Sequence, residues 1–85
     1  MQGPYYLVIA GSLPEAKEWA FKNGLPPVPS RKNGWSYVVS VNNLRGTMGT
    51  VVFVPGYQRR TELEPIIDMA FELIANGRLK EWNGG

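Results

Sequence analysis

The most informative segment for the fold is an unbroken apolar run, residues 5–10, which ends at Gly11 and leads directly into a helix-start signal. Aromatic and β-branched residues without polar alternation are typical of a strand buried on both faces, as in a parallel sheet. Ser12 and Glu15 have the spacing of a capping box, in which the two side chains satisfy backbone groups at a helix N-terminus. The sequence therefore predicts a buried strand followed by a helix over 13–21.

Glycine and proline delimit the middle of the chain. Gly24 is expected to end the first helix, and residues 24–34 are predicted to form a proline-rich loop, because proline fixes φ and lacks a backbone donor. Residues 35–41 alternate large and small side chains and are predicted to form a strand at the sheet edge. Residues 42–46 are compatible with one helical turn, and 50–54 form the most strand-like segment.

A second amphipathic helix is predicted after the third strand. Thr61 and Glu64 repeat the capping-box spacing, and a broad apolar stripe runs from there to Gly77, which is expected to end the helix. Residues 78–85 are predicted to be a C-terminal tail in which Trp82 folds back onto the body of the domain.

This order of elements predicts an α/β fold, because strands that alternate with helices form parallel sheets covered by those helices. We expect residues 1–85 to form a single domain with a three-stranded parallel sheet and two packed helices, a Rossmann-like fragment. The link between the second and third strands is short, which favours the spatial order first, third, second. Such a sheet has two open edges, so we also expect partner docking or a homodimer through an edge.

Composition predicts a protein of the cytoplasm. The 85 residues include no cysteine, and small exported domains usually carry disulfides. No basic segment precedes an apolar stretch at the N-terminus, and the apolar run at 5–10 is too short to cross a bilayer, so no membrane contact is expected. The net charge of +2 comes from nine basic and seven acidic residues spread along the chain, without an arm that would favour nucleic acid.

The chain has few of the residue types that catalyse reactions. It contains no histidine and no cysteine, and its only aspartate is Asp68, inside the second predicted helix. Neither GxxxxGK[ST] nor GxGxxG is present, so nucleotide hydrolysis is not expected. We predict that the protein is not an enzyme and uses no cofactor and no metal.

One edge of the sheet could still bind a ligand. In open α/β sheets, ligands bind beyond the carboxyl ends of the strands, where glycine turns and helix N-termini attract anions. The candidate binding residues at that edge are Gly11, Ser12, Asn42, Asn43, Arg45, Gly56, Tyr57, Arg59 and Arg60. They would hold a phosphate, a nucleotide or a nucleic-acid backbone. The alternative is that Ser12 and Thr61 only cap helices and that the arginines are solvated.

A family resemblance adds an expectation about origin. It is carried by Val8-Ile9-Ala10-Gly11-Ser12, Glu15-Ala16, Gly24-Leu25, Trp35-Ser36-Tyr37-Val38, Leu44-Arg45-Gly46 and Val51-Val52-Phe53-Val54. These motifs resemble small proteins of unassigned function from actinobacterial phages, mycobacteriophages especially, and the similarity spans residues 6–75.

Such proteins look like a trimmed half of a Rossmann-like or P-loop ATPase sheet. Here Gly11-Ser12 lacks the phosphate-binding lysine, and Val54-Pro55 stands where acidic residues would hold magnesium. The resemblance implies an accessory phage protein, made in the cytoplasm of the host, that binds a host protein and can inhibit host growth. Binding of a nucleotide, phosphate or nucleic acid at the sheet edge is the alternative.

Overall fold

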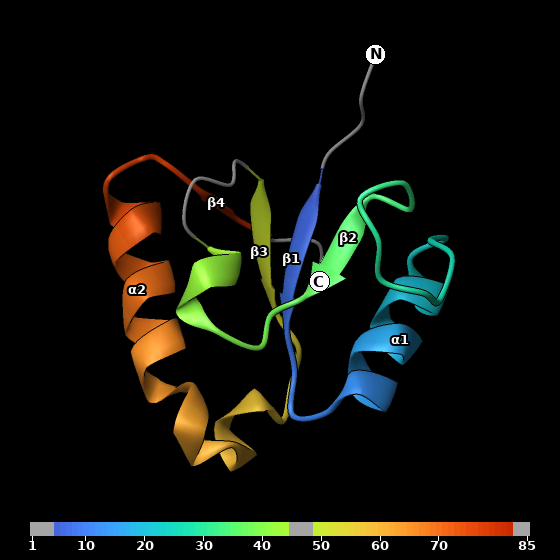
Figure 1. The fold of residues 1–85 in the computed structure, drawn as a ribbon, viewed down its shortest axis with the longest axis horizontal. Helices are drawn as coiled ribbons and strands as arrows, with labels where there is room; N and C mark the ends of the chain where they lie inside the picture. Colours follow the sequence, from blue (N-terminus) through green and yellow to red (C-terminus); the bar gives the residue numbers. More distant parts are fainter. Residues whose placement is uncertain (1–4, 45–48, 83–85) are drawn as a thin grey trace.

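The computed structural model describes residues 5–44 and 49–82 and shows an α/β domain with a small parallel sheet (Figure 1). The strands are β1 (Tyr6–Ile9), β2 (Trp35–Tyr37), β3 (Thr50–Phe53) and β4 (Lys80–Glu81), and the α-helices are α1 (Leu13–Lys22) and α2 (Glu64–Ala75). Three 3₁₀ turns complete the described elements: η1 (Val41–Asn43), η2 (Tyr57–Arg59) and η3 (Thr61–Leu63).

The sheet has four strands in the order β2-β1-β3-β4, and every neighbouring pair is parallel. The predicted α/β class, the parallel pairing and the edge position of β2 are confirmed. The predicted order is correct for the neighbours β1 and β3 but wrong for β2, which pairs with β1 instead of β3. The reason is that residues 38–49 are long enough to cross over β1, since a parallel connection needs only about a dozen residues.

The sequence pattern does not predict the fourth strand, since it places residues 80–81 in the C-terminal tail. Gly77 adopts φ +77° and ends α2 in a Schellman motif, in which Arg78 N–H donates to the Leu73 carbonyl at 2.9 Å. The chain then reverses and Lys80 N–H donates to the Gly49 carbonyl at 3.0 Å. Tertiary pairing therefore forms this strand from two exposed charged residues that carry no apolar strand pattern.

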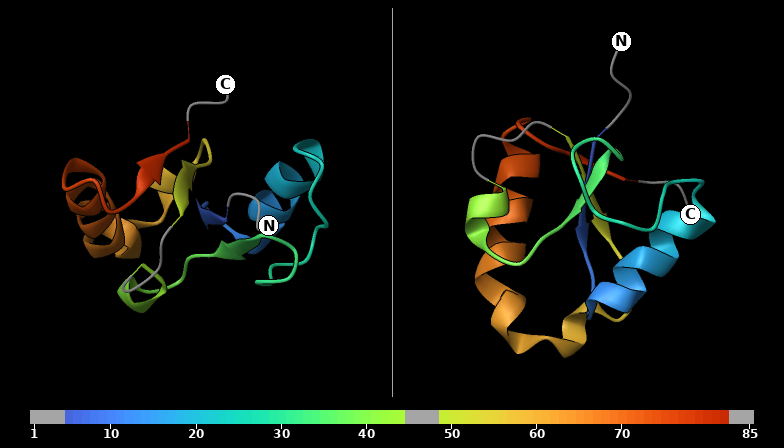
Figure 2. Two further views of the ribbon diagram at one scale, coloured as in Figure 1. Left: turned by 90° about the horizontal axis from the view of Figure 1, so that it is seen from above. Right: turned by 45° about the vertical axis from the view of Figure 1, so that its right-hand side comes forward.

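Each face of the sheet has its own apolar cluster. Leu7 and Ile9 of β1 belong to the cluster under α2, whereas Val8 and Ala10 belong to the cluster under α1. All four residues are at most 1% exposed, so the prediction that this strand is buried on both faces is confirmed. Figure 2 shows α1 and α2 on opposite sides of the sheet.

The ends of α1 follow the sequence signals. Ser12 is the N-cap, and its Oγ accepts the Glu15 N–H at 3.4 Å. At the other end, Gly24 has φ +78°, and the Leu25 N–H donates to the Ala20 carbonyl at 2.9 Å, which completes a second Schellman motif. The predicted helix start and the predicted role of Gly24 are both confirmed. Of the predicted capping box only the Ser12 half forms, because the Glu15 carboxylate accepts from the Ser12 hydroxyl and from Arg59 instead of a backbone N–H.

The start of α2 differs from the prediction. The helix begins at Glu64 after the turn η3, and its N-cap is Leu63, without a side-chain cap, so the predicted capping box from Thr61 is wrong. A cap at Thr61 would need the N–H of Pro65 for the first helical hydrogen bond, and proline has none. Pro65 instead stands at the second helical position, where that N–H is not needed.

Candidate functional site at the carboxyl ends of β1 and β3

From β1 the chain continues to β2 on one side of the sheet, and from β3 it continues to β4 on the other side. The turns after β1 and β3 therefore lie at a topological switch point. Gly11 follows β1 and Gly56 follows β3, and a methyl group added to Gly11 would lie 2.9 Å from the Gly56 carbonyl oxygen. The structure therefore brings these two predicted residues together. Gly56 also has φ +100°, a backbone conformation that favours glycine.

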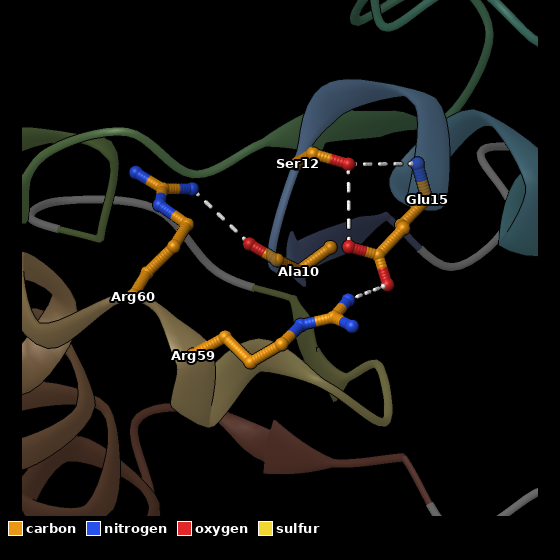
Figure 3. Close-up of polar contacts among 5 residues, drawn as sticks. All are labelled: Ala10, Ser12, Glu15, Arg59 and Arg60. Carbon is orange, nitrogen blue, oxygen red and sulfur yellow. Dashed lines mark hydrogen bonds and ion pairs between the residues drawn. The ribbon is translucent and has the colours of Figure 1, made fainter.

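A carboxylate of the chain itself fills the space above both turns. Glu15 Oε1 lies 2.7 Å from the position of a methyl group on Gly11, and Oε2 lies 3.2 Å from the equivalent position on Gly56. The Ser12 hydroxyl donates to Oε1 at 3.2 Å, and Arg59 Nη2 donates to Oε2 at 2.6 Å (Figure 3). An anion of the protein thus stands where a bound phosphate was expected.

The Glu15–Arg59 ion pair joins α1 to η2 across the switch point. The Glu15 side chain is 31% exposed and the Arg59 side chain is 69% exposed, so water screens part of the attraction. Glu15 was not among the predicted binding residues. Its position three residues after the N-cap Ser12 was the available signal, because a glutamate at that position can reach back toward the helix N-terminus.

Arg60 forms a more buried network than Arg59. Its side chain is 19% exposed, and Nη1 donates to the Ala10 carbonyl at 3.1 Å and to the Tyr37 hydroxyl (Figure 3 shows the contact with Ala10). The guanidinium also lies over the Tyr37 ring, 5.6 Å from its centroid. Arg60 therefore ties the connection after β3 to the end of β1 and to β2.

Glu62 completes this network at the surface. Arg60 Nε donates to Glu62 Oε1 at 3.0 Å. A hydrogen bond from the Glu62 backbone and the hydrogen bond from Arg60 lower the pKa of the Glu62 carboxyl below its ordinary 4.5. This carboxylate therefore stays charged at neutral pH and accepts from Arg60.

The remaining predicted residues lie apart from Gly11 and Gly56 or make internal contacts. Asn43 Oδ1 accepts the N–H groups of Val39 and Ser40, each at 2.9 Å, and so caps η1, which packs against α2. Asn42, in the same turn, is exposed. Tyr57 packs against the apolar cluster under α2. The predicted ligand Arg45 lies outside the described residues.

Two findings concern metal ligands and membrane-spanning helices among the described residues. Over 5–44 and 49–82, no three or more aspartate, glutamate, histidine or cysteine residues gather as metal ligands would. In the same part of the chain, no helix has the length and apolar character needed to cross a bilayer.

The fold and the site together define a small α/β domain whose switch point is filled by its own ion pair. Comparison of the chain with protein-family models, with curated proteins and with solved structures finds no match. The resemblance to actinobacterial phage proteins and to a Rossmann-like fragment therefore stays a prediction.

Proposed function

We propose that this chain is a non-catalytic accessory protein of an actinobacterial phage that acts by binding a host protein. The observation that carries the proposal is a row of aromatic side chains, Phe71, Phe53 and Tyr57, at the open part of the β3 edge. We call these three residues the aromatic row. The phage origin rests on the sequence resemblance.

The aromatic row is continuous and reaches the surface. The rings of Phe53 and Phe71 stack with centroids 5.1 Å apart and planes inclined by 18°, and Tyr57 lies 5.3 Å from Phe53. Phe71 is 48% exposed although it belongs to the apolar helix α2. Exposed aromatic groups on a packed base are enriched at protein interfaces, where one or two of them supply most of the binding free energy.

The sheet edge beside the row is only partly covered. β4 pairs with Thr50 and Val51, and the pairing ends before Val52 and Phe53. Peptides commonly add a strand to such an edge, with backbone hydrogen bonds for affinity and side-chain contacts for specificity. A host protein that presents an extended apolar segment would use both the edge and the row.

Anion binding at the switch point has less support. The Glu15 carboxylate fills the space above Gly11 and Gly56, and Arg60 is engaged with Ala10 and Tyr37. A phosphate would have to displace a carboxylate that is already paired with Arg59 at 2.6 Å. Absence of catalysis is supported by the sequence, which has neither histidine nor cysteine.

The test compares two exposed phenylalanines in a capture experiment. Phe71→Ser removes the most exposed end of the aromatic row, and Phe21→Ser is the matched control, because Phe21 is 72% exposed on α1. Tagged wild type, both variants and an unrelated tagged domain are incubated with actinobacterial lysate, and captured proteins are quantified by mass spectrometry. Affinity for the purified captured protein is then measured by calorimetry.

We expect wild type and Phe21→Ser to enrich the same host protein, and Phe71→Ser to bind it at least about tenfold more weakly, the size of a moderate hot-spot loss. Circular dichroism shows whether each variant is folded. Equal affinity of Phe71→Ser and wild type would refute the role of the row. If sedimentation shows that wild type is a dimer and that Phe71→Ser is not, the aromatic row serves self-association, and host binding at the row is refuted.

A further inference from the structure

A groove of about 620 Å³ runs beside α1, apart from the aromatic row. It lies between α1, the residues Val54 and Pro55 that follow β3, and Trp82, which follows β4. On this face of the sheet α1 contacts β2, and β4 lies at the opposite edge of the sheet (Figure 2). Sites for small molecules typically measure about 300–1,000 Å³ and are lined mostly by apolar groups.

The wall of the groove contains a buried donor without an acceptor. Trp19 is only 8% exposed, and its Nε1 has no hydrogen-bond partner among residues 5–44 and 49–82. By contrast, Nε1 of the fully buried Trp35 donates to the Pro26 carbonyl at 2.8 Å. Buried indole N–H groups normally find a partner, because an unpaired buried donor keeps its full desolvation cost.

Trp82 is the aromatic neighbour of Trp19 in the lining of the groove. Trp82 lies edge to face with Trp19, with centroids 5.4 Å apart and planes at 85°. Its backbone N–H donates to the Val51 carbonyl at 2.9 Å, which holds the main chain, and the side chain is half-buried. The Trp19 N–H is not exposed in this structure, so a ligand that accepts it must displace a neighbouring side chain; the half-buried Trp82 ring is the aromatic neighbour that also lines the groove.

The charges in the groove are already balanced. Glu18 pairs with Lys22 at 2.9 Å, and Glu15 pairs with Arg59 at 2.6 Å. The charged side chains of the lining thus already have partners of opposite sign, so a charged ligand would compete with these pairs, whereas a neutral ligand would leave both in place. The lining therefore favours an uncharged molecule with an apolar, flat body.

From these observations we infer that the groove binds an uncharged planar aromatic heterocycle. Its ring lies against Trp82, and a ring nitrogen or carbonyl oxygen accepts the Trp19 N–H. This site is independent of the proposed host-protein surface, because it shares no residue with the aromatic row.

The test uses quinoxaline, a neutral bicyclic compound with two acceptor nitrogens and no donor. Uniformly ¹⁵N-labelled protein is titrated while the three indole N–H signals are followed by NMR. We expect the Trp19 signal to move downfield and to saturate, and the Trp35 signal to stay in place because its N–H is already bonded to Pro26. Trp19→Phe, which keeps a ring but removes the donor, should weaken binding about fivefold or more.

Two further variants test whether quinoxaline binds in this groove and not at the aromatic row. Trp82→Ala removes the second aromatic wall and should weaken quinoxaline binding, whereas Phe71→Ser should bind it as wild type does. The inference is overturned if the Trp19 indole signal does not move up to the solubility limit of quinoxaline. It is equally overturned if Trp19→Phe binds the compound as tightly as wild type, since the donor then takes no part.

Discussion

Replacement of Arg60 by alanine is expected to destabilise the fold far more than replacement of its neighbour Arg59. Arg60 is 19% exposed and donates to the Ala10 carbonyl, the Tyr37 hydroxyl and the Glu62 carboxylate. Arg59 is 69% exposed and makes one ion pair with Glu15. The two arginines are adjacent in the sequence, so each serves as the control for the other.

The expected magnitudes follow from burial. In Arg60→Ala the carbonyl of Ala10, a residue that is 0% exposed, and the Tyr37 hydroxyl both lose a charged donor. A buried acceptor left unpaired costs about 1–3 kcal/mol, so we expect a loss of roughly 2–4 kcal/mol in the free energy of unfolding. Loss of the exposed Arg59 pair should cost only about 0.2–1 kcal/mol. The Arg60 loss corresponds to a decrease in Tm of roughly 8–30 °C in a domain of this size.

The assay is equilibrium unfolding in urea, followed by circular dichroism, for wild type, Arg60→Ala, Arg59→Ala, Tyr37→Phe and the double variant Arg60→Ala/Tyr37→Phe. Wild type, the two single variants and the double variant form a double-mutant cycle. If the Arg60–Tyr37 contact stabilises the fold, this cycle should give a coupling free energy of about 0.5–3 kcal/mol. Equal stabilities of Arg60→Ala and Arg59→Ala would refute the reasoning, because the two side chains would then contribute alike despite their different burial.

Three further outcomes are expected. Ser12→Ala removes the N-cap of α1 and should lower the free energy of unfolding by about 0.5–2 kcal/mol in urea titrations; an unchanged midpoint would contradict this. Gly49→Ala would place a methyl group 2.5 Å from the Tyr5 carbonyl oxygen and should lower the free energy of unfolding by about 1–3 kcal/mol. In Gly24→Ala the added methyl group meets no atom within 4 Å, so the only cost is the smaller strain of alanine at a positive φ. Thermal melts of the two variants test that order. Glu62 has a lowered pKa in the folded protein. Its contribution to the free energy of unfolding is therefore complete at a pH above its ordinary pKa of 4.5, and it is lost as the pH falls through the folded pKa. Urea midpoints from about pH 6 to pH 3 should therefore fall more steeply for wild type than for Glu62→Gln, and parallel pH profiles would contradict this.

Local signals in the sequence predicted most elements because each depends on nearby residues. The apolar run ending at Ala10 and the N-cap Ser12 specify β1 and the start of α1 through contacts within a few residues. The same local reasoning failed at Thr61, where Pro65 shifts the helix start, although proline was visible in the sequence.

The candidate site was predicted only in part. The meeting of Gly11 and Gly56 follows from parallel pairing of β1 and β3, which a strand-helix alternation already favours. The partners of the two arginines could not be predicted, since Arg59 is 44 residues from Glu15 and Arg60 is 50 residues from Ala10 along the chain. Such contacts depend on how the 3₁₀ turn after β3 directs each side chain.

The sequence by itself determined the α/β class, the parallel strands and the ends of α1, because apolar runs, caps and glycine turns act over a few residues. Only the tertiary structure decided that β2 pairs with β1, that the charged residues Lys80 and Glu81 form a strand, and that Glu15 fills the turn above Gly11. These features arise from hydrogen bonds and ion pairs between segments far apart in the chain, whose geometry exists only once the sheet has assembled.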